Sequence, residues 1–504
     1  MPTTLAAIDI GSNAIRLSIG RIENDRKVTV LDNFRDPVRL GRDVFTERVI
    51  SEETMDAAIE TFKRFREIID RNNATFTRAV ATSALREAMN RDSFTDNISH
   101  ACGIDIEVIN PEEEARLIYL AVADKVNLKN KTALLIDIGG GSTEITLTVD
   151  GSIISTESYR LGTVRLLQVL EEKKQGEKKF NLLVQEYVEA ARRRLKKEIG
   201  GKKIDLCVGT GGNIEAFGAL RKDLLGKERN GSFSSDDLNS ILKKLTSLSF
   251  EERVREIRLR PDRADVIIPA SIILQEIVKL AGIQEVIVPG VGLKEGLMID
   301  LGQAVLGEQK YSNREQVVTS AVEIGRKYSF DEQHGTSVAR YAVELFDQTK
   351  GLHNLPLEHR LLLEAAAMLH DVGTYISMTA HHKHTFYLIT ATPIIGLNSE
   401  QMQIVANVAR YHRKSFPKMQ HDHYRVLSSK NRIVVSKLAA ILRLADAMDN
   451  EHASRVSSFT VNYKKPHFTV HLQGDGDLLL EKWALMNKAD FFEEVFGVKL
   501  AIED

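Results

Sequence analysis

The sequence predicts an α/β protein with two related N-terminal domains, followed by a helical domain and a short mixed tail. Strand and helix patterns alternate over the first part of the chain and start again around a second glycine-containing turn. From about residue 310 to about residue 450 the pattern is almost entirely helical. We therefore predict domains at residues 1–124, 125–303, 304–452 and 453–504.

The repeated turn lies in AAIDIGSNAIRLSI near the N-terminus and again in LLIDIGGGSTEITL. Asp9 aligns with Asp137 and Gly11 with Gly139 at one offset, 128 residues (137 − 9 = 128), without a gap. After the second turn, polar and apolar residues alternate with the period of a strand. Each turn is therefore predicted as the tip of a β-hairpin, and the repeat indicates one structural device used twice.

Each remaining element has a local signal. Ser51 is a good N-cap for the long amphipathic helix SEETMDAAIETFKRFREIIDRN. RAVATS is predicted as a strand that leads into the helix ALREAMNRD, and DLCVGTGGN as a strand that opens another helix. In the tail, FTVNY and FTVHLQ alternate as strands before a last helix. The tail is therefore predicted as a small α+β unit.

Composition restricts the class of protein. With 504 residues, 43% hydrophobic and 27% charged, the chain has the balance of a multidomain globular protein. Cys102 and Cys207 cannot form a disulfide framework, and no signal peptide pattern is present, so we expect a cytoplasmic location. The longest apolar run, VIIPASIIL, is far too short to span a bilayer. The formal net charge of −2 does not exclude a polyanionic ligand.

The second turn, DIGGGSTE, differs from the common phosphate-binding loops because it lacks a Walker A ending and GxGxxG is absent. Its bare backbone N–H groups can bind an anion, and the alternative is a hairpin that needs glycine only for positive φ. The repeat favours two turns that close on one polyphosphate. Asp137 and Glu144 flank the turn and suit Mg²⁺. Alternatively, Asp137 only bonds the turn and Glu144 faces solvent on an edge strand.

Three acids occur in NPEEEARLIYLAV. Asn110 fits an N-cap, Pro111 the first helical position, and Glu113 the acid of a capping box. Helix initiation explains one or two of the glutamates, but three exceed that need. Glu114 is therefore a candidate to orient and deprotonate a water molecule.

The motifs DIGSN, ATSALREA, EEARL, DIGGGSTE, GTGGNIEA, RPDRADVIIPA and GLKEG occur in this order. The set resembles the exopolyphosphatase / guanosine pentaphosphate phosphohydrolase family, and the resemblance covers essentially the whole chain. It extends to a YHRK and an HKHTFYLI segment similar to those of the longer bacterial members. It implies two RNase H-like domains of the sugar kinase, Hsp70 and actin superfamily with a cleft between them, followed by a helical domain of HD type.

The same resemblance implies roles for individual residues. Glu114 would be the catalytic base, and Asp137 and Glu144, with Asp9 nearby, would hold Mg²⁺. Without the resemblance, Arg86 and Arg263 would each be interpreted as a member of a surface ion pair. The residues implied to hold the phosphates are Gly11, Ser12, Asn13, Ser83, Arg86, Gly139, Gly140, Gly141, Ser142, Gly209, Thr210, Gly211, Gly212 and Arg263.

The helical region contains a candidate second metal site. His334, the adjacent His370 and Asp371, and Asp446 lie on successive predicted helices. They form the ligand set of HD-type phosphohydrolases, and histidines beside carboxylates suit a transition metal. The histidines that would extend the site to two metals are His382, His384 and His412. The alternative is a group of hydrogen-bonded core histidines.

These observations predict an exopolyphosphatase that removes terminal phosphate from inorganic polyphosphate with Mg²⁺. Hydrolysis of guanosine pentaphosphate to the tetraphosphate would use the same residues and stays open. A nucleotide-binding regulator or kinase, and an enzyme whose HD-type site is the principal centre, are further alternatives. The resemblance also implies a homodimer, with no membrane or nucleic-acid partner expected.

Overall fold

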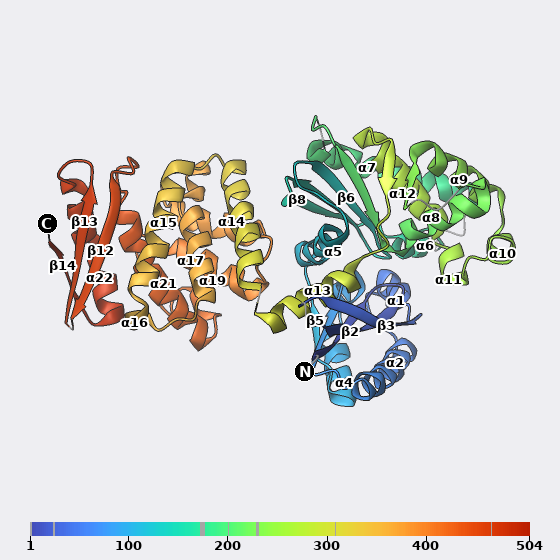
Figure 1. The fold of residues 1–504 in the computed structure, drawn as a ribbon, viewed down its shortest axis with the longest axis horizontal. Coiled ribbons are helices and arrows are strands. Elements are labelled where there is room, and N and C mark those ends of the chain that lie inside the picture. The colour runs from blue at the N-terminus through green and yellow to red at the C-terminus, as the bar shows by residue number, and fades with distance from the viewer. Residues whose placement is uncertain are drawn as a thin grey trace. The chain divides into compact units, whose positions relative to one another are not determined.

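The computed structural model describes residues 3–23, 26–171, 177–199, 201–227, 231–307, 309–464 and 466–503. By their internal contacts, the residues form two compact units, Met1–Gln309 and Lys310–Asp504 (Figure 1). Among the described residues, no helix combines the length and the apolar character that a membrane span requires.

The first sheet of the first unit has the strand order β3-β2-β1-β4-β5. Its strands are β1 (Thr3–Ile10), β2 (Ile15–Ile22), β3 (Val28–Asp36), β4 (Phe76–Ala81) and β5 (Ile106–Val108). β1, β2 and β3 pair antiparallel, whereas β4 runs parallel to β1 and β5 parallel to β4. The helices that accompany this sheet are α1 (Leu40–Glu47), α2 (Glu52–Arg71), α3 (Ser83–Glu87) and α4 (Arg91–Cys102).

A local signal explains where helix α2 begins. Ser51 caps α2, as predicted, because its hydroxyl accepts a hydrogen bond from the backbone N–H of Thr54 at 3.2 Å. The single helix predicted over ALREAMNRD is wrong, because α3 ends at Glu87 and α4 starts at Arg91. The side chain of Asn90 exchanges two hydrogen bonds with the backbone of Ile50, which ties down the residues between the helices.

The second sheet repeats this topology. Its order is β10-β11-β9-β6-β7-β8. β6, β7 and β8 pair antiparallel like β1, β2 and β3, and β9 runs parallel to β6 as β4 does to β1. The strands are β6 (Thr132–Ile138), β7 (Thr143–Val149), β8 (Ser152–Tyr159), β9 (Leu206–Thr210), β10 (Ser232–Ser234) and β11 (Glu285–Ile287). The predicted duplication is therefore present in the fold, with β10 added at one edge.

Most of the first unit's remaining helices surround this second sheet, and α12 contributes many side chains to its core. The full set of remaining helices in the first unit is α5 (Pro111–Lys125), α6 (Thr163–Glu171), α7 (Glu177–Ile199), α8 (Gly211–Leu225), α9 (Ser235–Ser247), α10 (Phe250–Arg255), α11 (Pro261–Ala264), α12 (Ile267–Ala281) and α13 (Leu293–Leu306).

Helix α13 follows the last strand of the second sheet but packs with the first sheet. Leu297 and Met298 share a hydrophobic cluster with Leu5 of β1 and Val80 of β4. The approach of α13 to α5 is close, because a Cβ atom at Gly296 would lie 1.7 Å from the carbonyl oxygen of Leu117. The chain therefore leaves the first sheet, builds the second, and returns to complete the first core.

The second unit is mainly helical, as the sequence predicts. Its helices are α14 (Gln309–Lys327), α15 (Glu332–Gln348), α16 (Lys350–His353), α17 (Glu358–Leu369), the 3₁₀ helix η1 (Val372–Tyr375), α18 (His381–Ala391), α19 (Ser399–Arg410), α20 (Asp422–Arg425), α21 (Ser429–Ala447) and α22 (Leu479–Phe496). A three-stranded sheet contains β12 (Val456–Lys464), β13 (His467–Gly474) and β14 (Lys499–Glu503). This sheet and the helices contribute to one hydrophobic cluster. The four-domain division stays a prediction.

Candidate functional site

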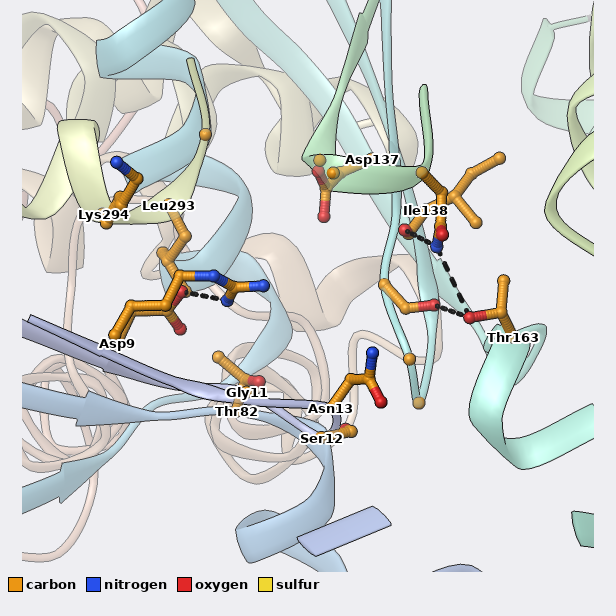
Figure 2. Close-up of a pocket in the computed structure, with 18 of the residues that line it drawn as sticks. Asp9, Gly11, Ser12, Asn13, Thr82, Asp137, Ile138, Thr163, Leu293 and Lys294 are labelled. Carbon is orange, nitrogen blue, oxygen red and sulfur yellow. Dashed lines mark hydrogen bonds and ion pairs between the residues drawn. The ribbon is translucent and has the colours of Figure 1, made fainter. Parts of the chain in front are cut away.

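A pocket of about 320 Å³ lies in the first unit where strands β1 and β6 end. Figure 2 shows Gly11, Ser12 and Asn13 of the first turn on one side, and Asp137 and the second turn on the other. The two turns nearly touch, because a Cβ atom built at Gly140 would lie 3.1 Å from Cβ of Ser12. The two hairpins thus form facing walls of one pocket.

The two turns have the same local geometry. The N–H of Gly11 donates to the carbonyl of Ala14 at 3.1 Å, and the N–H of Gly139 donates to the carbonyl of Ser142 at 3.0 Å. Both predicted hairpins are therefore confirmed. Gly139, Gly140 and Gly141 all lie in the described part of the chain, and none has a positive φ. Close packing, not backbone conformation, requires glycine here, since a Cβ at Gly141 would lie 2.3 Å from Oγ of Ser83.

Asp137 and Glu144 are paired across the second hairpin. The hydroxyl of Thr210 donates to Oδ1 of Asp137 at 2.7 Å, and the hydroxyl of Ser158 donates to Oε1 of Glu144 at 2.9 Å. Oε2 of Glu144 is buried and has no hydrogen-bond partner among the described residues. Glu144 is 2% exposed, and β7 lies between β6 and β8, so the alternative of a solvent-facing acid on an edge strand is wrong.

Glu114 is buried, with 7% exposure, and lines this pocket together with the half-buried Asp137, whereas Glu144 is not among the lining residues. Burial, together with the charge of Glu144, raises the pKa of Glu114 well above its usual range. Burial and the charge of Asp137 raise the pKa of Glu144 to about 7, and burial raises the pKa of Asp137 to about 6. A hard divalent cation fits this set of oxygen ligands, because its charge neutralises the acids. Oε2 of Glu144, which receives no hydrogen bond among the described residues, is free to coordinate such a cation.

The three glutamates at the start of α5 have different surroundings. Asn110 caps the helix, accepting from the N–H of Glu113 at 2.8 Å, as predicted. The carboxylate of Glu113 accepts from the guanidinium of Arg116 at 2.7 and 2.8 Å instead of reaching back to the cap. Glu114 alone of the three lines the pocket, where both terminal nitrogens of Arg86 lie 3.4 Å from its Oε2.

Two of the arginines that line the pocket, Arg263 and Arg16, have different hydrogen-bond partners. Arg263 is buried in the wall, where one guanidinium nitrogen donates to Oδ1 of Asn213. Burial and the nearby Arg260 lower the pKa of Arg263 to about 10. Arg16 donates to Oδ2 of Asp9 at 2.8 Å, so one oxygen of Asp9 is already engaged.

Residues 18–304 match the model of the Ppx/GppA phosphatase family, and residues 316–490 match the model of Ppx/GppA phosphatase domain III. The chain belongs to the Ppx/GppA phosphatase family. The predicted family is confirmed, and membership makes the chain a hydrolase of phosphoanhydride bonds.

Named relatives extend over most of the chain. It is 26% identical over 444 residues to the guanosine-5'-triphosphate,3'-diphosphate pyrophosphatase of Photobacterium profundum, covering 87% of this chain and 85% of the relative. It is 27% identical over 476 residues to the enzyme of the same name from Vibrio vulnificus, covering 93% of this chain and 90% of the relative.

Solved structures resemble the first part of the chain. An exopolyphosphatase from Cytophaga hutchinsonii has 27% identity and a TM-score of 0.55, covering 60% of this chain and 98% of that one. A Ppx/GppA family member from Aquifex aeolicus has 28% identity and a TM-score of 0.50, covering 61% of this chain and 99% of that one. These neighbours support the actin-like α/β fold predicted for the N-terminal part.

Most of the residues predicted to hold phosphate line the pocket of this Ppx/GppA protein. Gly209 and Thr210 belong to strand β9 and are not among the lining residues, because the helix of the GTGGN motif begins only at Gly211. Arg86 lies behind Glu114 and is also not among them. The predicted residues that line the pocket are Asp9, Gly11, Ser12, Asn13, Ser83, Glu114, Asp137, Gly139, Gly140, Gly141, Ser142, Gly211, Gly212 and Arg263.

Sequence reasoning missed several lining residues. Arg16 had a visible signal, because it aligns with Glu144 at the same offset of 128 residues (144 − 16 = 128). For the others, spacing gives no signal, because their elements meet only in the folded chain. They are Asn33, Arg35, Thr163, Asn213, Glu215, Arg260, Lys294 and Glu295.

In the second unit, the structure brings the predicted residues of the second metal site together. Nε2 of His334 and Nε2 of His370 lie 3.2 Å apart, and Nε2 of His370 lies 3.5 Å from Oδ1 of Asp446 and 3.8 Å from Oδ1 of Asp371. His412 joins this group, as predicted, with its Nε2 3.3 Å from Oδ1 of Asp371.

The residues predicted on α18 are wrong. His381 takes the place assigned to His382 and His384, because Nε2 of His381 lies 3.0 Å from Oδ1 of Asp371. α18 begins with the buried His381, whereas His382 and His384 are only half-buried and belong to none of the ligand groups found among the described residues.

Proposed function

We propose that the first unit is an exopolyphosphatase that removes the terminal phosphate of inorganic polyphosphate with Mg²⁺. The single observation that carries this proposal is a group of three carboxylates beside two hairpin turns: Glu114 and Asp137 line the pocket, and the buried Glu144 is paired across the second hairpin with Asp137. Phosphoanhydride hydrolysis needs a positioned water, a proton acceptor and neutralisation of the phosphate charge. This pocket offers groups for each requirement.

Asp137 and Glu144 would hold Mg²⁺, which supplies charge neutralisation for the transferred phosphoryl group. Gly140 and Gly141 line the pocket, and their backbone N–H groups would bind phosphate oxygens. Arg263 contributes positive charge in the pocket wall. In this proposal Asp9 supports the first turn, since its Oδ2 is engaged by Arg16.

Glu114 would orient the attacking water and accept its proton. Its raised pKa makes it a stronger base than an exposed glutamate once it is ionised. Arg86, at 3.4 Å, favours the ionised form and fixes the position of the carboxylate. Water would attack the terminal phosphorus in line with the departing chain, and the remaining polyphosphate would leave without a covalent phosphoenzyme.

A second candidate substrate is guanosine pentaphosphate, hydrolysed to the tetraphosphate. The relatives named guanosine-5'-triphosphate,3'-diphosphate pyrophosphatase favour it, because the similarity covers 87% and 93% of this chain. Both substrates end in the same triphosphate-like group, so the residues proposed above would act on either.

Three finer expectations belong to this proposal. The helical part would be a domain of HD type, which the arrangement of His334, His370, Asp371 and Asp446 supports. The protein would act as a homodimer, and it would be cytoplasmic.

The test compares phosphate release from long-chain polyphosphate and from guanosine pentaphosphate, with Mg²⁺, for wild type and Glu114→Gln. We expect the substitution to lower kcat about 10²- to 10⁴-fold on both substrates. Glu112→Gln is the matched control, since Glu112 lies in the same helical turn and is not among the residues that line the pocket. The substrate with the larger kcat/KM is the main one. Turnover that survives Glu114→Gln would overturn the proposed role of Glu114.

A further inference from the structure

A cluster of imidazoles and carboxylates lies inside the second unit, on elements far from one another in sequence. We call it the histidine centre. It consists of His334 on α15, His370 and Asp371 after α17, His381 on α18, His412 after α19 and Asp446 on α21.

Three groups of ligand atoms lie close together here; one joins His334 and Asp371 to the exposed His452, and the other two contain only residues of the histidine centre. Of these two groups, the first contains His334, His370 and Asp446, and the second contains Asp371, His381 and His412; within each group the atoms lie within 4.8 Å of one another. Asp371 adjoins both groups, because its Oδ1 is also 3.8 Å from Nε2 of His370. Two sets of three ligands meeting at one carboxylate are typical of a two-metal site.

Hydrogen bonds on the outer side fix the orientation of the four imidazole rings. Nδ1 faces an acceptor in every case. These acceptors are Oδ2 of Asp449 at 2.8 Å for His334, the carbonyl of Ala367 at 2.7 Å for His370, the carbonyl of Met378 at 3.2 Å for His381 and the carbonyl of Ala409 at 2.7 Å for His412. A carbonyl or a carboxylate can only accept, so Nδ1 carries the hydrogen in each ring. In a neutral ring Nε2 is then a bare lone pair.

These lone pairs point at one another. Nε2 of His334 lies 3.2 Å from Nε2 of His370, and Nε2 of His381 lies 3.2 Å from Nε2 of His412. Two bare nitrogens cannot hydrogen bond to each other, but both can bind a cation. Oδ1 of Asp371 is buried and, among the described residues, receives no hydrogen bond of good geometry, which agrees with nitrogens that carry no hydrogen. This is the outer-shell pattern of metal-binding histidines.

A histidine in the same unit shows what a core histidine without a ligand looks like. Nε2 of His353 lies 2.8 Å from the carbonyl of Phe346, and its Nδ1 accepts from the N–H of Leu355 at 2.8 Å. Both nitrogens of that ring are satisfied by the backbone. The histidine centre differs because its inward nitrogens face one another, Asp371, Asp446 and Arg413 instead of the backbone.

A cavity of about 250 Å³ opens beside the histidine centre. His334, His370, Asp371 and His381 line it, so part of the ligand set is reachable from the cavity. Arg413 also lines it, with Nη1 3.3 Å from Nε2 of His381. A cationic side chain beside a metal site favours an anionic ligand, and phosphate oxyanions suit both.

We propose that the histidine centre binds two divalent transition-metal ions, with Asp371 between them, and that the adjoining cavity takes a phosphate group beside Arg413. Imidazole ligands favour a transition metal over Mg²⁺. The proposal is independent of the function proposed for the first unit.

Metal content provides the main test. The full-length protein is stripped with a chelator, loaded with Mn²⁺ and dialysed against excess Mg²⁺, which replaces Mn²⁺ at the carboxylates of the first unit. Mn²⁺ is then measured by elemental analysis, with circular dichroism as a check of folding. We expect two Mn²⁺ per wild-type chain, and one or none for Asp371→Asn and for His381→Gln. His382→Gln is the matched control, since it removes the neighbouring imidazole, and it should keep two. Glu144→Gln should also keep two, which separates this site from the pocket of the first unit.

Electron paramagnetic resonance tests whether the two ions are neighbours. Wild type should give a spin-coupled Mn²⁺ signal, and His381→Gln should give the signal of isolated ions. Equal metal content in wild type, Asp371→Asn and His381→Gln, or a single uncoupled ion in wild type, would overturn the two-metal site.

The phosphate position is tested by titrating the Mn²⁺-loaded protein with inorganic phosphate while following the same signal. We expect saturation, with the dissociation constant raised about tenfold in Arg413→Gln, because a hydrogen bond to a charged group is lost. A signal that phosphate does not change would overturn this part of the proposal.

Discussion

The two glycine-turn hairpins share a backbone and differ in charge. In the first hairpin Asp9 is paired across the strands with Arg16, and the two side chains form an ion pair at 2.8 Å. In the second, Asp137 is paired with Glu144 at the equivalent position. Like charges opposite one another destabilise a hairpin, so the second hairpin needs a cation that the first already contains.

This difference shows how two hairpins with the same backbone can differ in the charges that they carry. Residues of both turns line the same pocket, but the pair of opposed acids occurs only in the second hairpin. A single exchange of charge, arginine in one copy and glutamate in the other, leaves only the second copy with the paired acids that we propose to hold Mg²⁺.

The largest effect is expected from Glu144→Arg, which gives the second hairpin the charge pattern of the first. The new guanidinium would pair with Asp137 and occupy the cation position. We expect Mg²⁺-dependent phosphate release to fall about 10³-fold or more, since metal charge stabilisation supplies several kcal/mol. Glu144→Gln, which removes the charge without adding a cation, should retain more activity. Equal activities of Glu144→Arg and wild type would show that the second hairpin holds no metal.

The crowding of the two turns should separate Gly141→Ala from Gly11→Ala. A Cβ at Gly141 would lie 2.3 Å from Oγ of Ser83, whereas at Gly11 the nearest atom is 3.4 Å away. We expect Gly141→Ala to lower the free energy of unfolding by about 1–3 kcal/mol, and Gly11→Ala to lower it much less. Urea denaturation of both variants measures the difference. A larger loss in Gly11→Ala would contradict the packing explanation.

The acids of the second hairpin should make the effect of Mg²⁺ depend on pH. The pKa of Glu144 is raised to about 7 and that of Asp137 to about 6. An acid with a raised pKa destabilises the fold as pH rises towards that pKa, so the metal-free protein should lose stability between about pH 4 and pH 7. Mg²⁺ relieves this repulsion only when the acids are ionised.

Mg²⁺ should therefore raise the thermal unfolding temperature more at pH 8 than at pH 6, by a difference equivalent to about 1–2 kcal/mol. Calorimetry with and without Mg²⁺ at both pH values checks this. The samples without Mg²⁺ contain no other divalent cation and have the same ionic strength. An equal shift at the two pH values would mean that these carboxylates do not bind the ion.

The smallest effect is expected from Arg16→Gln, which opens the ion pair of the first hairpin. Asp9 would lose its partner, and we expect stability to fall by about 1 kcal/mol, partly restored by Mg²⁺. Lys63→Gln, which opens an exposed pair with Glu60, should produce no measurable change in urea denaturation. No Mg²⁺-dependent recovery in Arg16→Gln would show that the first hairpin cannot acquire a cation.

Much of the fold follows from the sequence because hairpins, caps and helix periods are local. The repeat, the cap by Asn110 and the two acids of the second hairpin carry such local signals. Arg86 is different: only the fold brings it against Glu114, 28 residues away in sequence. His381 was missed in favour of its neighbours because the starting residue of α18 sets which side chain faces inward, and spacing does not fix that starting residue.

The return of α13 to the first sheet has a consequence for how the protein is made. The face of the first sheet around Leu5 and Val80 is covered by Leu297 and Met298, which are synthesised more than 200 residues after Val80 (297 − 80 = 217). On the ribosome, the N-terminal sheet therefore waits with an apolar face uncovered until the whole second sheet has emerged. Folding of the first unit is completed by its last helix, and this waiting interval is when chaperone binding would protect the nascent chain.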